Sequence, residues 1–280
     1  MTAEPYPRSA PWRRGVWLVV RVCLLVVCGL CLLLLFFQDR LLYHPRAYPA
    51  GVPLRPGVEA IRYPISAGPQ VGWWKPPAAG NTRWWLACAG NASLARTWLD
   101  VLETPDGLLL VDYPGFGENT GKPGPAAMRE ACLAAVAQLR ILHPELASVH
   151  GVLGHSLGAA AVLQVAADLK PQRIVIVAPF TRMLDMAQRV VGWPWCQLLL
   201  DRWDNRASLA RIDAATPIDL WHGDADTLIP VSMARSLTAE FPAIRLHLVA
   251  GAGHDDILGE IADQLLAPSL DHELRMPSQR

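Results

Sequence analysis

The chain has 280 residues, of which 52% are hydrophobic and 18% are charged. This length suits one domain of ordinary size with a short additional segment, and this composition excludes a chain that is disordered throughout. The 25 basic residues are balanced by 25 acidic ones. A nucleic-acid partner attracted by net charge is therefore not expected.

The first element is an apolar run from Val16 to Phe37, in which Arg21 is the single charged residue. About 20 apolar residues span a bilayer, so we expect residues 16–37 to form a transmembrane anchor. Residues 1–15 carry Arg8, Arg13 and Arg14. Basic residues before the span predict a cytoplasmic N-terminal segment and a main domain on the far side, which would be periplasmic or extracytoplasmic.

Three other interpretations of this run are weaker. A cleavable signal peptide has a shorter apolar region and a cleavage site flanked by small residues, and the stretch from Leu32 to Gln38 offers no such site. The pair Arg13-Arg14 resembles a twin-arginine signal, but its neighbours fit that signal poorly. A buried helix of a soluble domain would have to be covered on every side.

Strands and helices alternate through the rest of the chain. Residues 38–58 form a proline-punctuated connector, 59–267 the main domain with a short lid over 180–208, and 268–280 a polar tail. Short apolar runs predict strands over 60–65, 71–75, 84–89, 107–112, 173–178, 217–221 and 245–249, with another beginning at Val149. Helical patterns cover 92–103, 126–142, 157–169, 232–240 and 257–266, with broken helical segments in the lid. This alternation predicts an α/β fold with a mostly parallel sheet flanked by helices.

Of Trp73 and Trp74, we expect one to be buried and the other exposed, because successive side chains of a strand point to opposite faces of the sheet.

The strand that begins at Val149 runs into Gly154-His155-Ser156-Leu157-Gly158, and a helical pattern follows. A serine in such a strand-turn-helix is held in a strained conformation that presents its hydroxyl, and the glycines let strand and helix pass closely. We expect Ser156 to be a nucleophile. The alternative is a helix N-cap serine. Side-chain alternation directs His155 away from the site.

A serine nucleophile needs a base and an acid, and both candidates follow later strands. His254 lies in Gly251-Ala252-Gly253-His254, whose small residues give an imidazole room to reach the serine. Asp226 and Asp224 both follow the 217–221 strand as candidates for the acid that orients the base, and alternation does not separate them. The chain order Ser, Asp, His is the order of the α/β-hydrolase arrangement.

From about residue 40 to 267, the chain resembles serine hydrolases of the α/β-hydrolase superfamily, in particular a small membrane-anchored branch with little cap. The matching stretches are Leu41-Leu42-Tyr43-His44-Pro45, Gly90-Asn91-Ala92, the run from Asp112 to Gly117, the Ser156 pentapeptide, the run from His222 to Pro230, and Gly253-His254. The resemblance makes Asp226 the catalytic acid. It also implies an oxyanion hole formed by the backbone N–H groups of Leu157 and Asn91. The family's histidine before Gly90 is replaced by Ala89, which affects the support of this loop.

The resemblance implies a carboxylic ester or thioester hydrolase that acts through an acyl-enzyme, on a small acyl ester, a lysolipid or an acyl thioester. Two alternatives stay open, a non-catalytic binding protein of the same fold and a peptidase of the same fold. The sequence has no metal-ligand cluster, glycine-rich phosphate loop or dinucleotide fingerprint, so we expect no metal and no cofactor.

Overall fold

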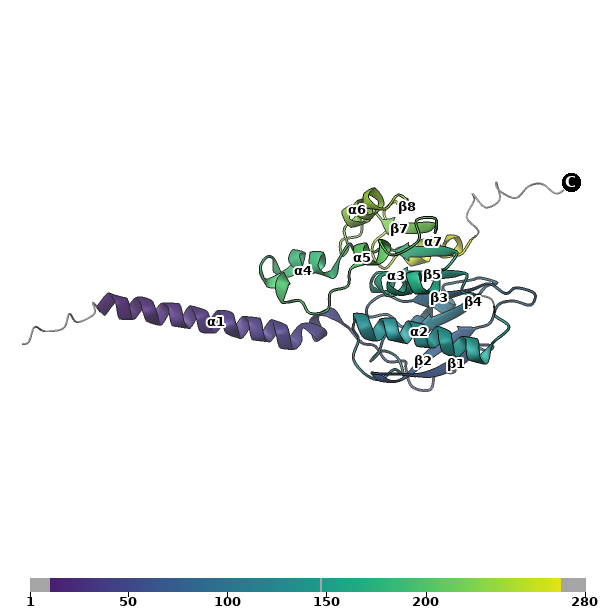
Figure 1. Ribbon diagram of the computed structural model, residues 1–280, viewed down its shortest axis with the longest axis horizontal. Helices are drawn as coiled ribbons and strands as arrows, with labels where there is room; N and C mark the ends of the chain where they lie inside the picture. Colours follow the sequence, from purple (N-terminus) through teal and green to yellow (C-terminus); the bar gives the residue numbers. More distant parts are fainter. Residues whose placement is uncertain (1–10, 147, 268–280) are drawn as a thin grey trace, which may run out of the picture.

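A computed structural model describes residues 11–146 and 148–267, so the predicted polar tail and most of the basic N-terminal segment lie outside the described residues. The long helix α1 (Pro11–Leu42) projects from a globular domain (Figure 1). It is long and apolar enough to cross a membrane, and its apolar span is not buried against the rest of the protein. The predicted apolar run is therefore one continuous helix that extends beyond the run at both ends.

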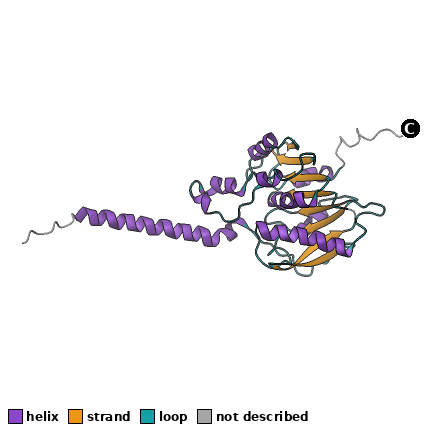
Figure 2. Ribbon diagram, in the orientation of Figure 1, coloured by secondary structure: helices purple, strands orange, loops and turns teal. Residues whose placement is uncertain are grey.

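The domain is built on a sheet of eight strands in the described part of the chain, in the order β1-β2-β4-β3-β5-β6-β7-β8. β1 pairs with β2, and β2 with β4, in antiparallel fashion, and the other neighbours are parallel (Figure 2). The strands are β1 (Glu59–Ile65), β2 (Gly68–Lys75), β3 (Trp84–Cys88), β4 (Gly107–Val111), β5 (Gly151–His155), β6 (Arg173–Val177), β7 (Ile218–Gly223) and β8 (Ile244–Val249). The predicted mostly parallel α/β sheet is confirmed.

Helices cover both faces of this sheet. Besides α1, the helices of the described residues are η1 (Ala95–Asp100), α2 (Pro125–Leu142), α3 (Leu157–Leu169), α4 (Met183–Val191), η2 (Trp195–Leu198), α5 (Asn205–Leu209), α6 (Val231–Glu240) and α7 (Ile257–Leu265), where η denotes a 3-10 helix. One core lies between the sheet and helices α2, α3 and α6, and a second lies between the sheet and η1 and α7. Burial on both faces explains why the central strands are apolar along their whole length.

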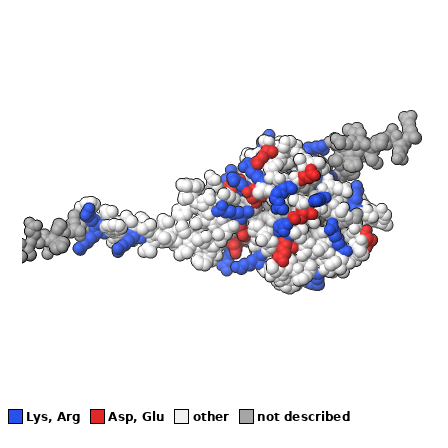
Figure 3. All heavy atoms as spheres, viewed as in Figure 1, with Lys and Arg blue, Asp and Glu red and all other residues white. Residues whose placement is uncertain are grey.

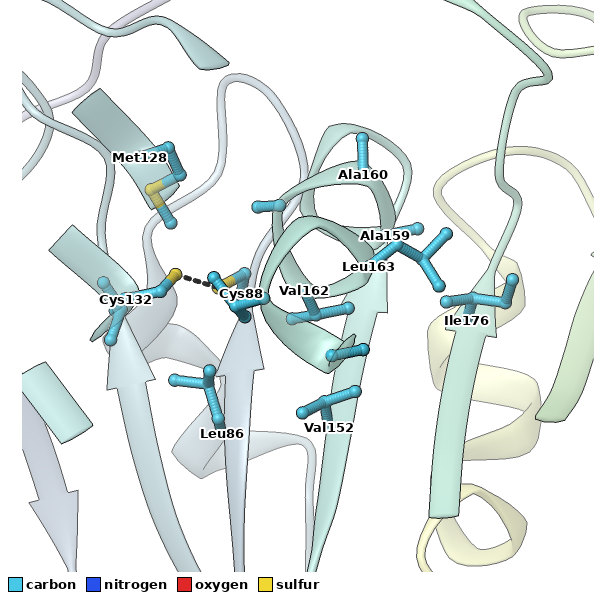
Figure 4. Packing of buried hydrophobic residues seen from close by; sticks show 14 of the residues in the cluster. Leu86, Cys88, Met128, Cys132, Val152, Ala159, Ala160, Val162, Leu163 and Ile176 are labelled. Carbon is cyan, nitrogen blue, oxygen red and sulfur yellow. Dashed lines mark hydrogen bonds between the residues drawn. The ribbon is translucent and has the colours of Figure 1, made fainter. Parts of the chain in front are cut away.

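Small side chains let α3 pack closely on the sheet. Val162 of α3 lies near Val152 of β5, and Ala159 lies on the side of the helix that faces Ile176 of β6 (Figure 4). Next to them, the Sγ atoms of Cys88 in β3 and Cys132 in α2 are 3.6 Å apart. Both cysteines are buried and free, and they serve as small apolar core residues here.

Two local predictions were wrong. Trp73 and Trp74 are both buried, at 1% exposure each, because β2 lies inside the sheet and contributes one tryptophan to each core. The helix predicted over 92–103 is only the 3-10 helix η1. Ala92 has a left-handed backbone with φ 59°, which an α-helix does not tolerate.

Candidate active site

Ser156 sits between β5 and α3, and its backbone has φ 55° and ψ −117°. This is a strained conformation for a residue with a side chain, of the kind found where a nucleophile is held out of a sheet. The two glycines of the pentapeptide are required sterically. A Cβ on Gly154 would lie 2.3 Å from the Gly158 carbonyl oxygen, and a Cβ on Gly158 would lie 2.0 Å from the Cys88 carbonyl oxygen.

Three side chains from separate loops form a continuous hydrogen-bonded chain. The His254 Nε2 atom is 3.0 Å from the Ser156 Oγ atom, and the His254 Nδ1 atom is 2.7 Å from the Asp226 Oδ2 atom. Asp224, the rival carboxylate, is exposed and instead accepts a hydrogen bond from the Gly251 N–H at 2.7 Å. The structure therefore brings Asp226, not Asp224, against His254.

The Asp226 carboxylate is buried and well supplied with donors. Its Oδ1 atom accepts hydrogen bonds from the Leu228 and Ile229 N–H groups at 2.9 and 2.8 Å. Burial acts to raise the pKa of Asp226, but the hydrogen bonds from His254 and from the Ile229 N–H outweigh it, so this pKa lies below its ordinary value. The carboxylate is thus ionised at neutral pH and able to stabilise a protonated His254.

His155 lies at the site, and the prediction that it points away was wrong. Its Nε2 atom is 3.0 Å from the His254 carbonyl oxygen, and the two imidazole rings are 4.9 Å apart. The alternation of side chains along a strand fixes the face of the sheet on which His155 lies, but it does not show which loop covers that face. In this protein the loop that carries His254 covers it. Burial, reinforced by the nearby His254, lowers the pKa of His155 to about 3, so this ring is neutral at physiological pH.

Both predicted oxyanion-hole residues line the same cavity as Ser156 and His254. The Leu157 N–H belongs to the first turn of α3, where backbone N–H groups have no acceptor within the helix. Asn91 lies in the loop after β3, and β3 is the neighbour of β5 in the sheet. The carboxyl ends of β3, β5, β7 and β8 thus supply every predicted site residue from one edge of the sheet.

The cavity has a volume of about 860 Å³ and is lined mainly by apolar side chains. The segment predicted to be a lid, residues 180–208, contributes Met183, Met186 and Val190 of α4 together with Trp195 and Leu198 of η2. The last turns of α1 contribute Leu34, Gln38, Leu41 and Leu42. The role of α1 in the cavity could not be predicted, because a helix that is apolar on all sides does not indicate which side contacts the domain.

In residues 11–146 and 148–267, no three His, Cys, Asp or Glu side chains are grouped as metal ligands would be. The polar groups at this site are those that nucleophilic catalysis by serine requires.

A comparison with protein-family models finds no match. Among curated proteins, the chain is 28% identical over 250 residues to Uncharacterized protein Rv2307c of Mycobacterium tuberculosis, covering 85% of this chain and 88% of that one. It is 24% identical to Uncharacterized protein YfhR of Escherichia coli, covering 92% of each. A match of 26% over 151 residues, 52% of this chain and 49% of the relative, links it to alpha/beta hydrolase domain-containing protein 17B of Xenopus laevis.

Solved structures with the same architecture include the Pyrococcus furiosus esterase Pf2001, with a TM-score of 0.60 and 19% identity, covering 78% of this chain and 90% of that one. The acylaminoacyl peptidase of Pyrococcus horikoshii has a TM-score of 0.58 and 10% identity, covering 74% of this chain and 40% of that one. The strand order, the strained serine turn and these likenesses agree: this chain has the α/β-hydrolase fold.

Proposed function

We propose that this protein is a membrane-anchored serine hydrolase that cleaves carboxylic esters or thioesters through an acyl-enzyme. The observation that carries the proposal is the hydrogen-bonded chain from Ser156 through His254 to Asp226, at the wall of an apolar cavity. Such a chain activates a serine hydroxyl, which is a weak nucleophile by itself at neutral pH.

In the proposed reaction the Ser156 Oγ atom attacks the acyl carbon while the His254 Nε2 atom takes its proton. The Leu157 and Asn91 N–H groups hold the oxyanion of the tetrahedral intermediate. His254 then donates the proton to the leaving oxygen or sulfur as the bond to the acyl carbon breaks. Water, deprotonated by His254, attacks the acyl-enzyme. His254 then returns the proton to the Ser156 Oγ atom as its bond to the acyl carbon breaks and the acid is released. Asp226 keeps the proton of His254 on Nδ1 and stabilises the imidazolium.

Two observations favour a substrate with an apolar acyl chain presented at a bilayer. The cavity wall is shared between the lid and the last turns of α1, the helix proposed to span the membrane. The lid also exposes apolar side chains outward, with Val190 81%, Trp193 74% and Leu200 68% exposed. Figure 3 shows charged side chains interspersed over the domain, whereas α1 is uncharged between its basic start and the domain. The exposed indole of Trp193 suits a position at the membrane interface, where tryptophan is enriched.

The proposed orientation has the N-terminus in the cytoplasm and the domain on the far side of the membrane, because Arg13, Arg14 and Arg21 all lie at the start of α1. Protease added to spheroplasts, in which the plasma membrane is intact and the periplasm is open, should digest an epitope tag at the C-terminus. A tag that is digested only after the plasma membrane is lysed would reverse the orientation.

Fluorophosphonate labelling tests the enzymatic proposal. The full-length protein, extracted in detergent, should be labelled and should hydrolyse short p-nitrophenyl esters, and Ser156→Ala should abolish both. Ser93→Ala removes the hydroxyl of the other serine that lines the cavity, and labelling should persist in this variant. A folded protein that does not react would contradict the proposal and favour a binding function.

Peptide hydrolysis is the second candidate, because the same fold carries the acylaminoacyl peptidase of Pyrococcus horikoshii. Assays with N-acylamino acid p-nitroanilides beside matched p-nitrophenyl esters distinguish the two. A higher kcat/KM for the anilide would assign a peptidase.

A further inference from the structure

The loop that carries Asn91 lacks the histidine that the resemblance leads one to expect, since Ala89 takes its place. Other contacts hold the loop at its start. The Tyr113 hydroxyl donates to the Ala89 carbonyl oxygen at 3.0 Å. Gly90 lies so close to His155 that a Cβ at this position would be 2.8 Å from the ring Nδ1 atom. These contacts fix the loop before Asn91 but not Asn91 itself.

Asn91 is held by its own side chain, which forms two hydrogen bonds to a segment far away in the sequence. The Nδ2 atom donates to the Leu42 carbonyl oxygen at 2.7 Å, and the Oδ1 atom accepts from the His44 N–H at 3.0 Å. The amide thus pairs with the main chain as a neighbouring strand would, using one donor and one acceptor. The same Oδ1 atom accepts from the Ala92 N–H at 3.1 Å. The peptide bond that follows Asn91 is therefore tied to the same side chain.

The segment that receives Asn91 is itself fixed. Leu42 is the last residue of α1. The adjacent Tyr43 is 2% exposed, and its hydroxyl donates to Asp201 at 2.7 Å and accepts from the Trp203 Nε1 atom at 2.9 Å. One turn earlier in α1, the Gln38 Oε1 atom accepts from the Leu200 N–H at 2.7 Å. The end of α1 is thus bound to the segment that follows η2, and it offers Asn91 an anchoring point that does not move freely.

We propose that the Asn91 side chain is a positioning group for the oxyanion hole: by pairing with the main chain of Leu42 and His44, it holds the Asn91 N–H at the cavity wall. The end of the anchor helix is on this view a structural part of the active site. The inference rests on the proposed function, because it assigns Asn91 a task in that reaction. It also accounts for a working loop without the family's histidine.

Geometry explains why asparagine is needed for this task. Aspartate has the same shape but only acceptor atoms, so one carboxylate oxygen would face the Leu42 carbonyl oxygen. Alanine would leave the Leu42 carbonyl and the His44 N–H without these partners and the loop without its tether. In both variants the backbone N–H of residue 91 is still present, so any loss reports on its position.

Steady-state kinetics of the full-length Asn91→Ala and Asn91→Asp variants in detergent test the proposal. Loss of one oxyanion donor lowers kcat by about 10²-fold, and we expect a fall of that order with KM changed by less than about threefold. Fluorophosphonate labelling should slow in parallel, because its phosphonyl oxygen uses the same hole. Asn81→Ala is the matched control, since the Asn81 side chain also bonds to main chain, at the Pro105 carbonyl oxygen, but does not line the cavity. This control should keep the parent kcat.

A second pair of variants addresses the other end of the tether. His44→Pro deletes the N–H that Asn91 accepts, whereas His44→Ala keeps it. We expect kcat of His44→Pro to be at least about tenfold below that of His44→Ala. This comparison does not alter Asn91 at all, so it separates the tether from any other effect of changing that residue.

The outcomes separate this inference from the proposed function. A labelled, active parent with Asn91→Ala and Asn91→Asp at the parent kcat would overturn the inference alone. So would equal rates for His44→Pro and His44→Ala, or a loss that appears only as a lowered melting temperature with kcat intact. A folded parent that is neither labelled nor active would overturn the proposed function, and this inference with it.

Discussion

Asp226→Asn is the substitution that tests the proposed hydrogen-bonded chain most directly. The carboxylate faces His254 Nδ1 at 2.7 Å with Oδ2, while Oδ1 accepts the Leu228 and Ile229 N–H groups. An asparagine keeps an oxygen for the two N–H groups, so its NH₂ group must face His254. An imidazole nitrogen that faces a donor has to be the acceptor. The ring proton then moves to Nε2, which can no longer take the proton of Ser156.

The size of the effect follows from this change of tautomer and from the lost negative charge. Such a change lowers kcat by about 10⁴-fold, or about 5 kcal/mol in the barrier. KM should change little, because Asp226 lies behind His254 and does not line the cavity. Rates of p-nitrophenyl butyrate hydrolysis and of fluorophosphonate labelling, measured on full-length protein in detergent, give both quantities.

Asp224→Asn is the matched control. Asp224 is exposed and its carboxylate contacts the Gly251 N–H rather than His254, so kcat should stay within about threefold of the parent value. If Asp226→Asn kept more than a tenth of the parent kcat, or if Asp224→Asn were the variant that lost activity, the reasoning would be refuted.

Three further predictions concern folding, pH and the lid. Gly158→Ala should destabilise the protein by several kcal/mol and abolish labelling, since its Cβ would lie 2.0 Å from the Cys88 carbonyl oxygen. Gly259→Ala, where a Cβ in α7 meets nothing within 4 Å, should raise stability by about 0.5–1 kcal/mol; equal melting temperatures for the two variants would contradict the clash. His155 has a pKa of about 3 in the fold, below its unfolded value, so its contribution is complete above about pH 6.5 and falls as pH is lowered. Between pH 6 and 4 the free energy of unfolding, measured in urea, should therefore fall less steeply with decreasing pH in His155→Gln than in the parent, by up to about 1.4 kcal/mol per pH unit. The same pH dependence in both proteins would show that His155 is protonated in the fold. Trp193→Ser should lower turnover of a long-chain ester in vesicles by about tenfold without altering hydrolysis of soluble p-nitrophenyl acetate; equal losses on both substrates would argue against contact of the lid with lipid.

The sequence by itself determined the sheet, its mainly parallel direction and the local form of the nucleophile turn. These features depend on short-range patterns. Apolar runs such as that of β4 report burial on both faces, and the steric demand for glycine at Gly154 and Gly158 is set by neighbours at the strand-to-helix turn. For the same reason, the boundaries of α2 and α3 agree with their predicted ranges to within a residue.

Only the tertiary structure decided how the loops meet. The choice between Asp226 and Asp224 and the position of His155 both depend on which loop covers which strand end, and side-chain alternation carries no information about that. Burial of both Trp73 and Trp74 depends on the place of β2 inside the sheet.

The contact between α1 and the candidate site likewise depends on the tertiary structure. Leu42 and Asn91 are 49 residues apart, and their hydrogen bond follows from the way α1 enters the domain. A uniformly apolar helix does not encode its docking side in its composition. The hydrogen bonds that hold the Asn91 loop against the end of α1 are therefore set by the tertiary structure alone.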